Sequence, residues 1–141
     1  MKFKTKTRYG IRAMVEIAKS GQKGGILQKN ISKNQKISNK YLDQIIHSLK
    51  EAELIATVKG KKSGYRLTKN ASEITVLEIH YAFDREIAII ECLSEQVDCA
   101  MEDICNTYPF WDGLNKLIIE YFRHVTLQDI LDKKEFPVRP L

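Results

Sequence analysis

Residues 37–51, ISNKYLDQIIHSLKE, constrain the fold more than any other stretch because they combine a helix start signal with a single apolar stripe. Ser38 is a suitable N-cap, and Ile37 and Leu42 then occupy the two positions of a hydrophobic staple. Helical spacing predicts an inward stripe of Leu42, Ile45, Ile46 and Leu49. The outward face is therefore polar, with Lys40, Gln44, His47 and Glu51 at its centre and Asn39, Asp43 and Ser48 beside them.

A shorter helix is expected just before this one. Leu27 and Ile31 share one side of a helix spanning about residues 27–33, and a tight turn at residues 34–37 follows. A short helix, a turn and a longer helix with a polar outer face form a helix-turn-helix, whose second helix enters the major groove of DNA. Lys40 and Gln44 could then read guanine and adenine edges. The alternative is an ordinary helical pair with a solvated face.

The residues that follow predict a β-hairpin. An extended apolar segment at residues 55–58 leads into a basic turn bounded by glycines at 60 and 64, and residues 65–67 return. A hairpin directly after a recognition helix is the wing of a winged helix, which favours DNA binding over the plain helical pair. The candidate DNA-contacting residues are Asn39, Lys40, Tyr41, Asp43, Gln44 and His47 on the helix, and Lys59, Lys61, Lys62, Tyr65 and Arg66 in the wing.

Charge divides the chain into two unlike halves. Residues 1–69 hold 17 Lys and Arg against 4 Asp and Glu, whereas residues 70–141 hold 6 against 14. A basic half that also carries a winged-helix pattern is best explained by contacts with nucleic acid phosphates. The chain has no apolar run of membrane-spanning length and no signal-like start, so we expect a cytoplasmic protein.

Further helices are expected on both sides of this unit, so the predicted fold is mainly α with a small β-hairpin wing. A first helix at about residues 7–20 ends at a group of glycines, and Thr75 with Glu78 has capping-box spacing. Pro109 starts a long helix that is apolar over most of its circumference, which predicts packing on its own domain and on a twin subunit. Thr126 with Asp129 caps a short last helix.

These elements predict four segments along the chain. Residues 1–70 form the winged helix-turn-helix, and residues 71–108 form a linking helix and a cysteine-containing sensor loop. Residues 109–133 form the dimerisation helix with the short terminal helix, and residues 134–141 form a flexible tail.

All three cysteines, Cys92, Cys99 and Cys105, lie in residues 91–105 among five acidic residues and no basic one. Their odd number and local clustering argue against a disulfide framework and leave metal binding, thiol redox chemistry or chance. In a single helix Cys105 would point nearly opposite to the other two, so only an irregular loop could aim all three together. The C-x6-C-x5-C spacing matches no zinc ribbon, so zinc is not favoured.

The chain resembles the IscR-like family of bacterial winged-helix regulators over almost its whole length. The matching stretches occur in the family's order and are TKTRYGIRAMVEIA, ISNKYLDQIIHSLKEAELI, VKGKKSGYRL, EITVLEIHYAFD, the three cysteines and VTLQDIL. The resemblance implies a homodimer crossed through the long helix and bound to a partly palindromic operator. It also implies an iron-sulfur cluster on Cys92, Cys99 and Cys105, with two-iron two-sulfur favoured and four-iron four-sulfur possible.

The fourth cluster ligand departs from the family pattern. Two-iron members carry a histidine where this chain has Tyr108, and nitric-oxide-sensing relatives supply an aspartate where it has Arg8. A further relative uses a carboxylate and an imidazole at the positions of Arg8 and Arg12. The remaining candidates are an exogenous molecule and the side chains of Tyr108, His80, His124, Asp98 and Glu102.

The resemblance implies a regulator, in which the cluster switches DNA affinity in response to redox state, iron or nitric oxide. Two other classes stay open. One is a regulator of the same fold without a cluster, acting by thiol oxidation or through a protein partner. The other is a small thiol oxidoreductase, which is remote because the chain lacks a C-x-x-C pair, a glycine-rich nucleotide loop and a convincing acid-base pair.

Overall fold

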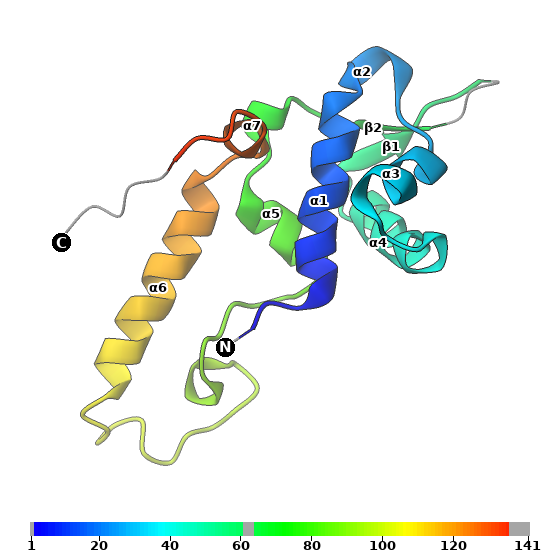
Figure 1. Cartoon of the computed structure of the whole chain (residues 1–141). Coiled ribbons are helices and arrows are strands. Elements are labelled where there is room, and N and C mark those ends of the chain that lie inside the picture. Colours follow the sequence, from blue (N-terminus) through cyan, green and yellow to red (C-terminus); the bar gives the residue numbers. More distant parts are fainter. Residues whose placement is uncertain (1, 61–63, 136–141) are drawn as a thin grey trace.

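A computed structural model describes residues 2–60 and 64–135 of the chain. It confirms the expected fold class, because helices dominate and the two strands pair in one antiparallel hairpin. The elements follow the order of Figure 1 and are α1 (Thr5–Lys19), α2 (Gly21–Gly24), α3 (Gln28–Gln35), α4 (Asn39–Glu51), β1 (Ile55–Thr57), β2 (Tyr65–Leu67), the 3-10 turn η1 (Ala71–Glu73), α5 (Val76–Tyr81), the 3-10 turn η2 (Glu91–Leu93), α6 (Tyr108–His124) and α7 (Leu127–Leu131).

Helices α3 and α4 form the expected helix-turn-helix. Ser38 is the N-cap of α4, and its side chain accepts a hydrogen bond of 3.2 Å from the backbone N–H of Tyr41. The left-handed backbone of Lys36 (φ 54°) ends α3 and turns the chain toward α4. The predicted inward stripe of α4 is buried in full, and its members are Leu42, Ile45, Ile46 and Leu49.

The hairpin lies beside α3, with Ile55 opposite Leu67 and Thr57 opposite Tyr65. A short bridge adds the chain before α3 to the hairpin, because Ile26 and Tyr65 exchange backbone hydrogen bonds of 2.9 and 2.8 Å. Gly64 permits this approach, since a Cβ there would lie 2.8 Å from the Ile26 backbone. Lys61 and Lys62, the basic residues expected at the wing tip, lie outside the described residues.

One hydrophobic core joins the helix-turn-helix to later parts of the chain. Met14 and Ile17 of α1 are fully buried at its centre, and Ile79 of α5 and Leu127 of α7 belong to the same cluster. The start of α5 and the start of α7 are also tied by backbone hydrogen bonds, Val76 N–H to Val125 and Leu127 N–H to Ile74. The core therefore continues past residue 70, where the first predicted segment ends.

The glycine-containing segment after α1 differs from expectation. The first helix ends at Lys19, as the glycines predicted, but residues 21–24 form the additional short helix α2. Gly25, with φ 63°, then ends α2 in a conformation that residues with side chains rarely adopt.

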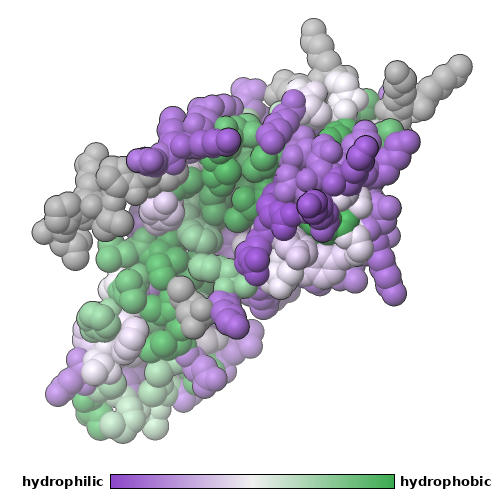
Figure 2. Space-filling view, in the orientation of Figure 1, coloured by the Kyte–Doolittle hydropathy of each residue, from purple (hydrophilic) through white to green (hydrophobic). Residues whose placement is uncertain are grey.

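Helix α6 lies at the edge of the fold, on the far side of α5 from α1 (Figure 1). It carries two different apolar sides. One side faces the protein, where Phe122 stacks on Phe3 with ring centroids 5.1 Å apart and Asn115 is buried. The other side is exposed, and hydrophobic residues gather over this region in Figure 2. Its large apolar members, spaced as in a coiled-coil seam, are Phe110, Leu114, Leu117 and Tyr121.

None of the helices in residues 2–60 and 64–135 is long and apolar enough to span a bilayer.

Candidate nucleic-acid interface and cysteine segment

The polar face predicted for α4 is open to solvent. In Figure 2 the surface over α3 and α4 is mostly hydrophilic, unlike the surface over α6. Tyr41 is half-buried instead, and its ring meets Tyr9 of α1 edge to face at 5.6 Å. His47 pairs with Glu51 one turn later at 3.3 Å. The exposed residues of the predicted set on α4 are Asn39, Lys40, Asp43, Gln44 and His47.

The described candidates of the wing differ in exposure. Lys59 is exposed, whereas Tyr65 and Arg66 are half-buried. The Arg66 guanidinium donates a hydrogen bond of 3.1 Å to the Leu67 carbonyl. Arg66 therefore supports the strand as well as presenting a positive charge.

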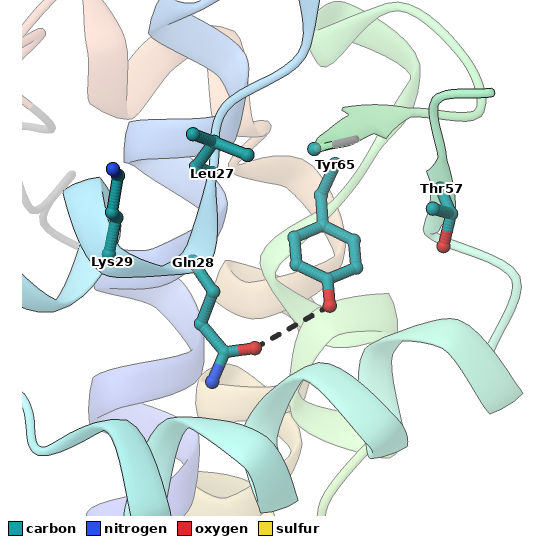
Figure 3. A pocket seen from close by; sticks show the side chains of 6 residues that line it. Leu27, Gln28, Lys29, Thr57 and Tyr65 are labelled. Carbon is teal, nitrogen blue, oxygen red and sulfur yellow. Dashed lines mark hydrogen bonds between the residues drawn. The ribbon is translucent and has the colours of Figure 1, made fainter. Parts of the chain in front are cut away.

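A pocket of about 390 Å³ lies between α3 and the hairpin (Figure 3). Tyr65 and Gln28 point toward each other across it, with the phenol oxygen 3.5 Å from Gln28 Oε1. Gln28 also donates to Asp43 of α4 through a hydrogen bond of 2.5 Å. Two candidates, Asp43 and Tyr65, are thus linked by Gln28, which was not among the residues predicted from the sequence.

A buried carboxylate fixes the turn before α4. Glu16 of α1 is only 6% exposed and accepts hydrogen bonds from Asn34 Nδ2 at 3.0 Å and Gln35 Nε2 at 2.7 Å. Arg12 donates to the Gln35 side chain at 3.0 Å and also to its backbone carbonyl. Arg12 lies over the Tyr9 ring at 5.0 Å, so one polar network runs from α1 to the helix-turn-helix.

Sequence reasoning missed Glu16, although a signal was present. The inward face of α1 includes Ala13, Met14 and Ile17, and Glu16 interrupts this apolar run with a charge. A buried charge needs partners, and the sequence alone did not identify them, since the amides that bond to Glu16 lie 18 and 19 residues away.

The three cysteines occupy the irregular segment between α5 and α6. Cys92 lies in the turn η2, and all three residues are half-buried free thiols. Glu86 organises this turn, since its carboxylate accepts from the Ser94 hydroxyl at 2.5 Å and from Glu95 N–H at 3.1 Å. Asn115 of α6 holds the residues before this turn, accepting from Ile89 N–H and donating to the Ile87 carbonyl.

The loop conformation expected for the cysteines is present, but the thiols do not meet. Within residues 2–60 and 64–135, no three side chains of His, Cys, Asp and Glu come close enough together to hold a metal ion. Three thiols are chemically suited to an iron-sulfur cluster. In the arrangement described here, however, their positions do not fit one.

Cys105 has an environment that favours its thiolate. The Thr107 hydroxyl lies 3.2 Å from the Cys105 sulfur. Hydrogen bonds from the Thr107 side chain, and then from the backbone of Thr107 and Tyr108, lower the pKa of the Cys105 thiol below its ordinary value. Hydrogen bonds to the sulfur stabilise its charged form, so they favour the thiolate.

The fourth-ligand candidates have other partners. Burial and the nearby Glu102 raise the pKa of Tyr108, which disfavours its phenolate. His80 is buried and directs one ring nitrogen to Thr7 and the other to the Glu86 carbonyl, at 3.4 and 2.9 Å. His124 ends α6, which places it about 24 Å along the helix from Tyr108, at 1.5 Å per residue.

Comparison with known proteins matches this arrangement to one family. The family model Rrf2, described as an iron-dependent transcriptional regulator, matches residues 3–133. The regulator IscR of Pectobacterium atrosepticum is 33% identical over 96% of this chain and 82% of its own length. IscR of Vibrio atlanticus is also 33% identical, over 96% of this chain and 78% of its own length.

Solved structures agree with the sequence matches. CymR of B. subtilis, the global cysteine regulator, superimposes with a TM-score of 0.77 at 27% identity, covering 96% of this chain and 99% of CymR. IscR of T. potens gives a TM-score of 0.76 at 30% identity, covering 96% and 89%. These relatives are transcriptional regulators and not enzymes. The chain belongs to the Rrf2 family of helix-turn-helix transcriptional regulators.

Proposed function

We propose that this regulator is a homodimer that reads a partly palindromic operator with α4 and grips the adjacent backbone with its wing. The observation that carries the proposal is the exposed polar face of α4. Ser38 caps this helix, and the β1–β2 hairpin follows it directly. Lys40 and Gln44 would contact base edges, because Lys suits guanine and Gln suits adenine. Lys59, and Lys61 and Lys62 from the sequence, would contact phosphates or the minor groove.

The exposed stripe of α6 supports the dimer. Phe110, Leu114 and Leu117 fall within an arc of about 60° at 100° per residue, and they are 65%, 38% and 50% exposed. A second copy of the helix would cover this stripe in the manner of a coiled coil. Two recognition helices held in this way could occupy operator half-sites about 34–36 Å apart.

The cysteine segment is the proposed sensor. Cys92, Cys99 and Cys105 would hold an iron-sulfur cluster of the two-iron or four-iron type, and the family's description as iron-dependent supports this assignment. Cluster binding would require the segment to differ from the arrangement seen here, because the thiols are not gathered in it. The bound cluster would supply a centre that responds to iron, oxidants or nitric oxide.

A second candidate is sensing by thiol oxidation without a cluster. The lowered pKa of the Cys105 thiol favours it, since thiolates are the reactive form of cysteine. Anaerobic purification separates the two candidates. Bound iron and sulfide with visible absorbance would support the cluster, whereas a colourless protein with oxidisable thiols that change DNA affinity would support the thiol switch.

The DNA-binding proposal is tested by operator selection from a random duplex pool. Gln44→Ala or Lys40→Ala should change base preference, because each removes a base contact. Lys59→Ala, Lys61→Ala or Lys62→Ala should weaken binding to all duplexes alike and lower the salt dependence. If the unchanged protein selects no preferred sequence, the proposal of a specific operator is wrong. If the α4 variants and the wing variants both lose affinity equally for all duplexes, the face assigned to base contacts is wrong.

A further inference from the structure

Gln28 lies where α3, α4 and the hairpin come together. Its Nε2 is 2.5 Å from Asp43 Oδ1 and 3.3 Å from the Asn39 carbonyl, and both of these residues are on the exposed face of α4. Its Oε1 faces the Tyr65 phenol at 3.5 Å, the outer limit of a hydrogen bond. One half-buried amide therefore contacts three residues that were candidates for DNA contact.

The chemistry of these partners allows only one orientation of the Gln28 amide. The NH₂ group faces two acceptors, a carboxylate and a backbone carbonyl, while the amide oxygen faces a hydroxyl donor. A flipped amide would place its oxygen against the Asp43 carboxylate and lose both donated bonds. A hydrogen bond to an ionised acceptor is also stronger than a neutral one, so Gln28 and Asp43 hold each other in place.

The position of Asp43 matters because a carboxylate on a recognition helix has two opposite effects. It can accept a hydrogen bond from the amino group of cytosine, which gives base preference. It also repels the phosphate groups on either side of the groove. Which effect prevails depends on where the carboxylate points, and Gln28 Nε2 holds its Oδ1 toward α3.

We infer that Gln28 is a specificity-determining residue, which acts by holding the Asp43 carboxylate on the face of α4 that reads DNA. This inference rests on the DNA-binding function proposed above. Gln28 is a positioning residue in this scheme, because the base is read by Asp43. The wing takes part through Tyr65, so a shift of the hairpin is transmitted to the carboxylate by the same amide.

The test measures binding to duplexes that differ at one base pair, for the full-length protein and its variants. The selected operator is altered at every position in turn, and the position where Asp43→Ala relaxes the preference is identified. Gln28→Ala should relax the preference at that same position by about tenfold, the discrimination expected of one well-placed base contact. Gln28→Glu should have at least as large an effect, because it sets two carboxylates against each other.

The double variant decides whether Gln28 acts through Asp43. In the Asp43→Ala background, Gln28→Ala should cause no further loss of preference, since there is no carboxylate left to hold. Additive losses would mean that Gln28 contacts the DNA itself, and they would overturn the inference.

A matched control exists on α7, outside the helix-turn-helix. Gln128 of α7 donates to Asp132 through a hydrogen bond of 2.9 Å, so the pair has the same chemistry as Gln28 and Asp43. Gln128→Ala should leave base preference unchanged. Lys29 is next to Gln28 and exposed, and Lys29→Ala should weaken binding to all duplexes by the same factor.

Two further outcomes contradict the inference and are distinguishable from each other. If Gln28→Ala lowers thermal stability but keeps the base preference, Gln28 is only structural, and the proposed function stands. If the unchanged protein has no preferred duplex, the proposed function fails and the inference fails with it.

Discussion

Glu16 Oε1 accepts a hydrogen bond of 2.7 Å from Gln35 Nε2, so a carboxylate on α1 holds the turn that leads into α4. Replacing Glu16 with Ala removes this bond and the one from Asn34. We expect a loss of about 2 kcal/mol in the free energy of unfolding, the usual range for hydrogen bonds to a buried charge. Urea denaturation measures it, with the exposed Lys33→Ala as the control.

The same carboxylate predicts a pH dependence of stability. Burial acts to raise the pKa of Glu16, but hydrogen bonds from Asn34 and Gln35 and the charge of Lys19 outweigh it, so the pKa lies below its ordinary 4.5. The stabilisation is therefore complete above pH 4.5 and is lost as the pH falls through the lowered pKa. The difference in unfolding free energy between the unchanged protein and Glu16→Gln should be constant near neutrality and shrink in acid.

Asp129 gives a second acid-sensitive contact at the start of α7. The Lys134 side chain, and then Thr126, lower the pKa of the Asp129 carboxyl from 3.8 to about 2. Stability from this capping box is present above pH 3.8 and is lost as the pH falls through about 2. Asp129→Asn should lower the melting temperature at neutral pH, and most of the difference should be gone near pH 2. A difference that persists unchanged at that pH would contradict the assignment.

The exposed stripe of α6 predicts a charge-sensitive dimer. Leu117→Glu places a carboxylate at the centre of the stripe, and the facing helix would place a second one nearby. Sedimentation should show a dimer for the unchanged protein and a monomer for this variant. Lys116→Glu is the matched control, because it adds negative charge to the same helix but lies about 100° or more away from the stripe.

Thr107 is expected to control the reactivity of Cys105. Thr107→Val removes the hydroxyl 3.2 Å from the sulfur, so the pKa of the Cys105 thiol should rise toward its ordinary value. Alkylation of Cys105 near neutral pH should become slower, as mass spectrometry of the labelled peptides would show. Cys92 and Cys99 provide internal controls, and equal slowing at all three positions would indicate a change in the segment's exposure instead.

Sequence reasoning found the features that depend on local signals. The cap at Ser38 and the capping boxes of Thr75 with Glu78 and Thr126 with Asp129 are present as predicted, because each needs only residues three apart. The two strands of the hairpin also followed from local pattern, whereas their register is seen only in the structure. Gln28 and Glu16 escaped notice because their partners are 11 to 37 residues away, and only the folded chain brings them together.

The cysteine segment marks a different limit. The geometry of a single helix excluded convergence of Cys92, Cys99 and Cys105, and the irregular loop that this argument required is present. A loop permits convergence without enforcing it, since no repeating backbone geometry fixes where its side chains point. The spacing alone therefore predicted the loop but left the position of each thiol open.

The core that continues from Met14 of α1 to Leu127 of α7 has a mechanical consequence. A flexible linker between the helix-turn-helix and α6 would absorb a displacement of α6. Here α5 and α7, which flank α6 in the sequence, pack in the same core as α1. In the proposed dimer, a tilt of α6 imposed by the second copy or by the cysteine segment would therefore also rotate the helix-turn-helix to which it is joined. A small rotation would then change the distance between the two α4 helices, so that they no longer match the spacing of the operator half-sites.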